Sequence, residues 1–78
     1  MTRCLISQVP SNSYVQITEI SGDATEVKRL EALGLYKDRR VRIVKGGFTS
    51  IVAMESGNRI CIRASAKLNI FCDILNGE

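Results

Sequence analysis

The sequence predicts a small domain that is mostly β-structure with one short helix. Seventy-eight residues leave room for a single hydrophobic core, apolar and polar residues alternate in several short segments, and one segment has a helical period. We therefore expect residues 1–78 to form one domain. A chain of this length buries only about 60% of its unfolded surface, so folding needs nearly all of its apolar side chains.

Two strands are expected before the helix, in residues 4–9 and 14–20. The second segment is rich in β-branched residues, which favour strands. Alternation places Val15 and Ile17 on its inner face, with Glu19 following on the same side. A Ser-Gly-Asp sequence then ends the pattern, as is typical of a turn.

One helix of about three turns is expected next. Its apolar stripe recurs every third residue, at Ala24, Val27, Leu30 and Leu33. Asp23 is a suitable N-cap. Gly34 can adopt the left-handed conformation that ends many helices, and Leu35 can then pack back onto the helix, as in a Schellman motif.

Four short strands are expected after the helix, in residues 40–45, 49–55, 59–63 and 69–75. Residues 64–68 are long enough for one helical turn. Many short strands in so few residues favour a strongly bent barrel, because closure of a sheet removes its exposed edges. A small SH3-like barrel with one short α-helix fits these lengths best. An OB-like barrel, which has longer strands, is the alternative.

Positive charge is concentrated in one part of the chain. Residues 37–67 hold eight basic and two acidic residues, a net charge of +6, whereas the remainder holds three basic and six acidic residues, a net charge of −3. Such an asymmetry favours acidic partners and speeds their association. Arg39, Arg40 and Arg42 suit carboxylate or phosphate recognition, because a guanidinium can bind two oxygens of one group.

We expect these residues to form a partner-binding surface, which consists of Tyr36, Arg39, Arg40, Arg42 and Phe48. Phe48 directly follows a Gly-Gly turn, where an exposed ring can anchor a partner, and Tyr36 lies beside the basic turn. Each ring can instead tuck under the barrel rim, and basic residues often form an ordinary solvated face. The sequence leaves these alternatives open.

No catalytic or metal-binding motif is present. The chain has no His, which removes the commonest general base and metal ligand. Cys4, Cys61 and Cys72 include no Cys-x-x-Cys pair, whereas a structural zinc site needs four nitrogen or sulfur donors. We expect no enzyme, no cofactor and no metal site. Cys72 is expected to be a buried apolar residue, and Cys61, between two arginines, could be reactive if exposed.

The odd number of cysteines and the lack of a long apolar run also bear on location. A secreted chain of this length usually has an even number of cysteines, and a membrane span needs about 18 apolar residues. We therefore expect a cytoplasmic protein with reduced thiols and no direct membrane insertion.

The sequence resembles the FeoA family over roughly residues 5–75. The runs that carry this resemblance are Arg29-Leu30-x-x-Leu33-Gly34-Leu35, Val41-x-Ile43-Val44 and Ile60-x-Ile62-Arg63-x-x-Ala66-x-x-x-Ile70. Family members commonly have Pro-Gly in the turn after the helix, where this chain has Lys37-Asp38. Because Asp adopts the left-handed conformation at modest cost, we expect the turn to persist.

The resemblance implies an SH3-like barrel and a function in ferrous iron transport. Such a protein is a small cytoplasmic accessory protein that contacts the GTP-binding domain of an FeoB-type iron transporter. The resemblance also implies weak binding of transition metal ions, for which the sequence itself supplies no ligand set.

Three other functions are consistent with parts of the sequence. A nucleic-acid-binding barrel would use the basic residues for phosphate contacts. However, the four aromatic residues are not interleaved with the basic ones, so nucleic acid is not the expected partner. A metal-sensing domain taken from a repressor would lack its helix-turn-helix segment. An enzyme is the least consistent of the three.

Overall fold

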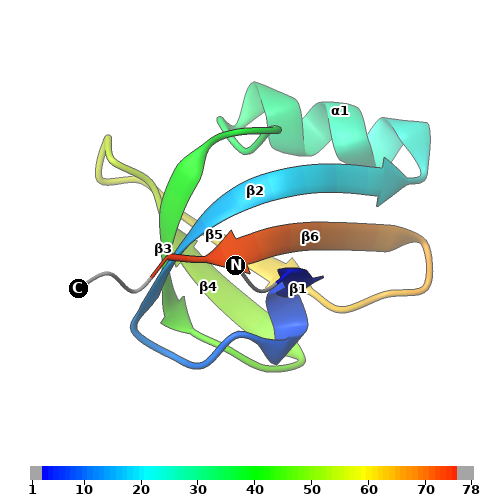
Figure 1. The fold of residues 1–78 in the computed structure, drawn as a ribbon. Helices are drawn as coiled ribbons and strands as arrows, with labels where there is room; N and C mark the ends of the chain where they lie inside the picture. Colours follow the sequence, from blue (N-terminus) through cyan, green and yellow to red (C-terminus); the bar gives the residue numbers. More distant parts are fainter. Residues whose placement is uncertain (1–2, 76–78) are drawn as a thin grey trace.

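A computed structural model describes residues 3–75, which form six β-strands, one α-helix and one short 3₁₀-helix (Figure 1). In chain order the elements are β1 (Arg3–Leu5), η1 (Ile6–Gln8), β2 (Ser13–Gly22), α1 (Ala24–Ala32), β3 (Arg40–Lys45), β4 (Thr49–Ala53), β5 (Arg59–Arg63) and β6 (Leu68–Ile74). The fold is mostly β with one short helix, which confirms the predicted class.

All six strands belong to one antiparallel sheet with the order β1-β6-β2-β3-β4-β5. The sheet bends strongly, so that β2 and β6 cross over β4 and β5 in Figure 1. This arrangement is consistent with an SH3-like barrel. The expected closure is incomplete, because within residues 3–75 no strand pairs with the outer edge of β5.

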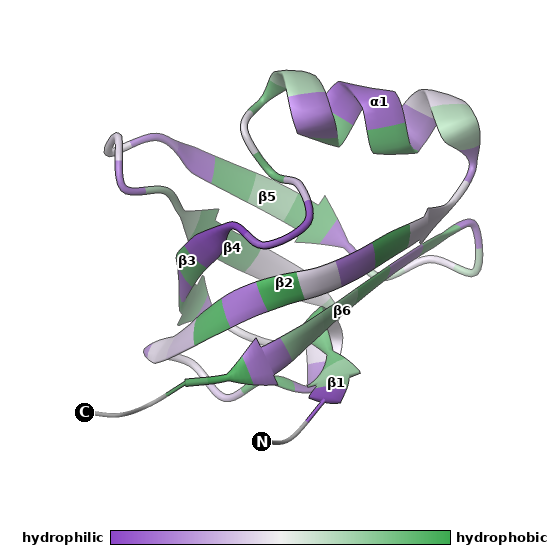
Figure 2. Ribbon diagram, turned by 45° about the horizontal axis from the view of Figure 1, so that its top comes forward, coloured by the Kyte–Doolittle hydropathy of each residue, from purple (hydrophilic) through white to green (hydrophobic). Residues whose placement is uncertain are grey.

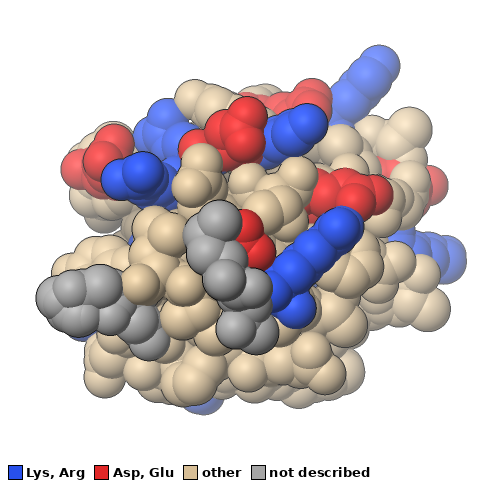
Figure 3. Space-filling view, viewed as in Figure 1, with Lys and Arg blue, Asp and Glu red and all other residues tan. Residues whose placement is uncertain are grey.

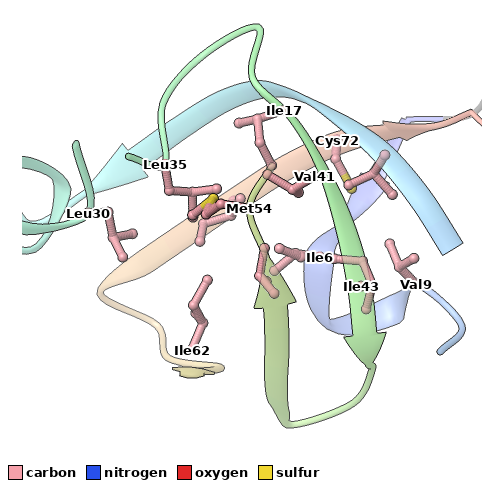
Figure 4. Packing of buried hydrophobic residues seen from close by; sticks show 13 residues of the cluster. Ile6, Val9, Ile17, Leu30, Leu35, Val41, Ile43, Met54, Ile62 and Cys72 are labelled. Atoms are coloured by element: carbon pink, nitrogen blue, oxygen red, sulfur yellow. The ribbon is translucent and has the colours of Figure 1, made fainter. Parts of the chain in front are cut away.

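The hydrophobic core fills the space between the two halves of the bent sheet (Figure 4). It consists of Ile6, Val9, Val15, Ile17, Leu30, Leu35, Val41, Ile43, Val52, Met54, Ile62, Ile70 and Cys72. Hydrophobic and hydrophilic residues alternate along β2 and β3, as Figure 2 shows, because successive side chains of a strand lie on opposite faces. The alternation in the sequence therefore predicted correctly which side chains of these strands point toward the core.

The first predicted strand is shorter than expected. β1 ends at Leu5, and the chain then turns through η1. This turn buries Ile6 and Val9, which a continuous strand over residues 4–9 would place on opposite faces. Burial of two apolar side chains therefore favours the 3₁₀ turn over a longer strand.

Glu19 does not share the inner face of β2. The pairing register between β2 and β6 shifts between Ile17 and Glu19, as in a β-bulge, and this shift turns Glu19 outward. Its carboxylate forms an ion pair with Arg3, and both side chains are half-exposed. Acidic and basic side chains lie close together over the β2–β6 face in Figure 3, and this ion pair belongs to that face.

The predicted apolar stripe of α1 is buried in part, and one expected helical turn is absent. Leu30 is buried and Val27 is half-buried, whereas Leu33 is 49% exposed. Residues 64–68 form a turn closed by a β-bridge between Ser65 and Leu68 instead of a helical turn. There the Ser65 hydroxyl accepts a hydrogen bond from the Lys67 N–H at 3.0 Å, which competes with helical bonding.

Both ends of α1 have the predicted caps. The Asp23 carboxylate accepts a hydrogen bond from the Glu26 N–H at 3.2 Å. At the other end the Leu35 N–H donates to the Leu30 carbonyl at 2.9 Å, and the Gly34 N–H donates to the Glu31 carbonyl at 3.0 Å. This pair of bonds defines a Schellman motif, with Gly34 at a φ of +102° and Leu35 fully buried.

The turn after the helix also persists without Pro-Gly. Asp38 has a φ of +72°, in the left-handed region that the sequence required of it. Its N–H donates to the Ile17 carbonyl at 2.7 Å, and the Ile17 N–H donates to the Arg39 carbonyl at 2.8 Å. These two bonds fix the turn against β2.

The three cysteines have different environments. Cys72 is fully buried and lies opposite Cys4 in the pairing of β1 with β6, whereas Cys61 is exposed on β5. Burial raises the pKa of the Cys72 thiol from its ordinary value of 9.0 to about 12, and the neighbouring Cys4 thiol and Asp73 carboxylate add to this rise. The prediction that Cys72 is a buried apolar residue is confirmed.

We expect Gly34→Val to lower the free energy of unfolding by about 1–3 kcal/mol, because a β-branched residue resists the positive φ. A Cβ at this position meets no atom within 4 Å, so the loss comes from the backbone alone. Urea unfolding measures the change. Ala32→Val, at an exposed helical position, is the matched control and is expected to cost less than about 1 kcal/mol. Equal losses in the two variants would contradict the left-handed assignment.

We expect iodoacetamide at pH 8 to alkylate Cys61 rapidly and Cys72 hardly at all. The thiolate is the nucleophile, and a pKa of about 12 keeps Cys72 protonated at that pH. Peptide mass spectrometry reads out both sites, with Cys61→Ser as the control. Equal alkylation rates at Cys61 and Cys72 would refute the burial of Cys72.

The raised pKa of the Cys72 thiol also stabilises the fold below pH 9, and this contribution to stability is lost as the pH rises from about 9 to about 12.

Candidate functional site

Arg40 and Arg42 project from the exposed face of β3. Val41 and Ile43, between and beyond them, are buried, so strand alternation directs the two arginines outward together. Across the β2–β3 pair, Tyr14 lies opposite Arg42 and Gln16 lies opposite Arg40. We call Tyr36, Arg39, Arg40 and Arg42 the basic surface.

Tyr36 and Arg39 are joined within the turn that precedes β3. The Arg39 guanidinium donates to the Tyr36 hydroxyl at 2.7 Å and lies 5.3 Å from the centre of its ring, which is cation–π geometry. The Arg39 N–H also donates to the Tyr36 carbonyl at 3.1 Å. Because the same turn is bonded to Ile17, the ring and the guanidinium are held in place before any partner binds.

None of the three arginines of the basic surface forms an ion pair with a carboxylate among residues 3–75. Arg42 donates to the Asn12 side-chain oxygen at 3.1 Å, which is a neutral partner. The two ion pairs found within residues 3–75 are Arg3–Glu19 and Arg29–Glu26, neither of which includes Arg39, Arg40 or Arg42. In addition, the Arg39 Nε is buried and lacks a hydrogen-bond partner within the same residues.

A shallow groove adjoins Arg40 and Arg42. Its volume is about 270 Å³, and it is lined by Tyr14, Arg40, Val41, Arg42, Ala53, Met54 and Glu55. Tyr14 is 57% exposed at this groove, and Tyr36 is 41% exposed in the neighbouring turn. Exposed aromatic rings beside arginines are typical of surfaces that bind another macromolecule.

Phe48 lies on a different part of the molecule. It precedes β4, its carbonyl accepts a hydrogen bond from the Ala64 N–H at 2.7 Å, and the residue is 69% exposed. It lines a second groove, of about 320 Å³, which it shares with η1, the end of β5 and residues 64–70. The structure therefore brings together four of the five predicted residues and separates Phe48 from them.

Two residues beside the basic surface were not predicted as part of it. Tyr14 comes next to Arg42 through the register of β2 with β3, and Asn12 reaches Arg42 from a left-handed conformation, with a φ of +69°. Tyr14 lies on the face of β2 opposite Val15, as strand alternation requires. Its position beside Arg42 depends on the register, which a local pattern does not contain.

The described part of the chain has no metal-ligand cluster. Within residues 3–75, no group of three or more His, Cys, Asp or Glu side chains is placed to hold a metal ion. Nor does any helix in this range have the length and apolar content needed to cross a membrane.

Comparisons with curated proteins and with solved structures give no significant match. A family model, the FeoA domain, matches residues 4–73. The match covers nearly the whole chain. The chain therefore belongs to the FeoA family, and this membership supports a role in ferrous iron transport.

Proposed function

We propose that this protein is a cytoplasmic accessory protein of ferrous iron transport that binds the GTP-binding domain of an FeoB-type transporter through the basic surface. The observation that carries this proposal is the set of three arginines, none of which has an ion-pair partner within residues 3–75. Neighbouring positive charges without ion-pair partners attract an acidic surface and accelerate its association.

The geometry of the turn supports binding to a protein partner. Association costs conformational entropy whenever side chains become ordered at an interface. Here the Tyr36 ring and the Arg39 guanidinium are already held together, and their turn is bonded to β2. Less entropy is therefore lost when they bind, which favours a specific interface over diffuse charge attraction.

RNA is the competing partner, because the same arginines can contact phosphates and exposed tyrosines can stack on bases. Tyr14 and Tyr36 both lie beside arginines in the folded chain, and for Tyr14 the order of residues along the sequence did not indicate this. RNA is therefore the necessary comparison in any binding experiment.

We expect reversal of Arg40 and Arg42 to Glu to slow association with the isolated GTP-binding domain about tenfold at low salt, because the charges that steer the encounter change sign. The difference is expected to shrink at high salt. Stopped-flow or surface-binding kinetics measure both rates. Arg40→Glu and Lys28→Glu change the net charge equally, so they form a matched pair, and Lys28 lies on the exposed side of α1.

Two results would contradict this proposal. One is equal association rates for Arg40→Glu and the parent at low salt, which would make the basic surface an ordinary solvated face. The other is tighter binding of an unrelated RNA than of the GTP-binding domain by the parent protein.

We expect metal removal to leave the thermal midpoint unchanged, because no ligand cluster among residues 3–75 links metal binding to folding. Any binding of transition metal ions by the folded protein is then weak. Elemental analysis before and after dialysis against EDTA, with thermal scans of both samples, tests this. Stoichiometric zinc or iron that survives dialysis would contradict it, and Cys61→Ser would then show whether the exposed thiol is a ligand.

A further inference from the structure

β5 has an edge that the rest of the described sheet leaves unpaired. It pairs with β4 on one side and is the last strand in the sheet order. The hydrogen bonds Met54 N–H to Asn58 carbonyl and Ala64 N–H to Phe48 carbonyl bracket this pair at 2.8 and 2.7 Å. Together with the register, they fix which backbone groups of β5 point toward β4 and which point away.

Alternation in an antiparallel pair gives the orientation of each residue. Ile60 and Ile62 occupy hydrogen-bonded positions opposite Val52 and Ser50, so their backbone groups point toward β4. Arg59, Cys61 and Arg63 occupy the other positions, and their N–H and C=O groups therefore point to the open side. None of these three residues forms a backbone bond to a loop or turn elsewhere in residues 3–75.

A hollow runs along this open side. A groove of about 240 Å³ separates β5 from α1 and is lined by Cys61, Ile62 and Arg63 on one side and by Glu26, Arg29 and Leu30 on the other. It adjoins the groove that contains Phe48, because both are lined by Ile62, Arg63, Ser65 and Leu68. The edge of β5 therefore borders two adjoining grooves, which we call the depression, instead of a paired strand.

The depression has an apolar floor and a basic border. Leu5, Ile62, Leu68 and Ile70 line the groove near Phe48. Arg63 and Lys67 line the groove beside α1, and Arg59 is exposed at the other end of β5. Figure 2 shows the corresponding pattern along β5, which is hydrophobic in the middle and hydrophilic at both ends. Glu26 is the acidic residue that lines these grooves, and Arg29 pairs with it at 2.7 Å.

We propose that this edge binds an extended acidic segment of a partner protein, which adds to the sheet as a strand antiparallel to β5. Main-chain hydrogen bonds to Arg59, Cys61 and Arg63 would supply affinity. Alternate side chains of the segment face the apolar floor, and acidic side chains between them meet Arg59 and Arg63. This site is separate from the basic surface and stands whether or not that surface binds the transporter.

The charges also argue against a second copy of the same chain as the occupant. Two β5 strands paired antiparallel about Cys61 would place each Arg59 directly opposite the Arg63 of the other copy. Like charges at directly opposed positions destabilise a strand pair. Arginines at both ends of an edge strand therefore oppose self-association and favour an acidic strand.

A short synthetic peptide tests the proposal on the full-length protein. The probe is acetyl-Val-Glu-Val-Thr-Val-Glu-Val-amide, whose two Glu residues align with Arg59 and Arg63 when Thr lies opposite Cys61. Titration followed by NMR is expected to shift the N–H signals of these three residues and slow their hydrogen exchange. The exchange of Ile60 and Ile62, whose N–H groups are already bonded to β4, is expected to change little.

Backbone methylation separates strand addition from simple charge attraction. Methyl groups on the N–H groups of Glu and Thr remove the hydrogen bonds to β5 and are expected to weaken binding at least about tenfold. Methyl groups on the N–H groups of the last three Val residues of the peptide point away from β5 and leave charge and side chains unchanged. This matched control is expected to bind within about twofold of the parent peptide.

Protein variants locate the site. Arg63→Glu is expected to weaken binding of the unmethylated peptide at least about fivefold. Arg42→Glu, on the basic surface, is expected to leave the affinity for this peptide unchanged. Equal affinity of the two methylated peptides overturns the proposal, and so does an equal loss of peptide affinity in Arg63→Glu and Arg42→Glu. Failure of the peptide to bind at millimolar concentration, or pairing of β5 with a second copy in solution, overturns it as well.

Discussion

The backbone of Ile17 connects the two halves of this small fold. Its side chain is fully buried in the core, while its N–H and C=O groups bind the turn at residues 38–39. This turn links the end of α1 to the start of β3, so one residue fixes the helix, the turn and the strand in relation to β2. Asp38 must adopt a positive φ to make this contact, and the bonds to Ile17 offset the cost of that conformation.

The basic surface follows from the same constraint. Because the turn is bonded to β2, Arg39 leaves it at a fixed point beside Tyr36, and β3 begins directly afterwards with Arg40. The positions of these charges are therefore set by backbone hydrogen bonds and not by ion pairs. A surface arranged in this way retains its shape when salt screens its charges.

Local patterns predicted the features that depend on neighbouring residues. The Asp23 cap, the Schellman ending at Gly34 and the outward direction of Arg40 and Arg42 all follow from spacings of one to five residues. Features that depend on strand pairing were not predictable in the same way. The bulge that turns Glu19 outward and the register that brings Tyr14 beside Arg42 both arise from contacts between distant segments.

Strand pairing between distant segments also explains the separation of Phe48 from the basic surface and the incomplete closure of the barrel. Phe48 lies near the basic residues in sequence, but the β3–β4 hairpin carries it to the end of β5. A count of short strands indicates a barrel but does not show that the outer edge of β5 has no strand partner among residues 3–75. This open edge becomes apparent only when the pairing of all six strands is known.

The sparse attachment of α1 has a consequence for motion. Leu30 is the helical side chain buried in the core, and the helix is otherwise held by its two ends, including a bond from the Asp23 N–H to the Lys67 carbonyl at 2.8 Å. Release of the N-terminal end therefore breaks few contacts and costs less than unfolding of the sheet. Since α1 forms one wall of the depression beside β5, such partial opening would widen the depression while all six strands stay paired.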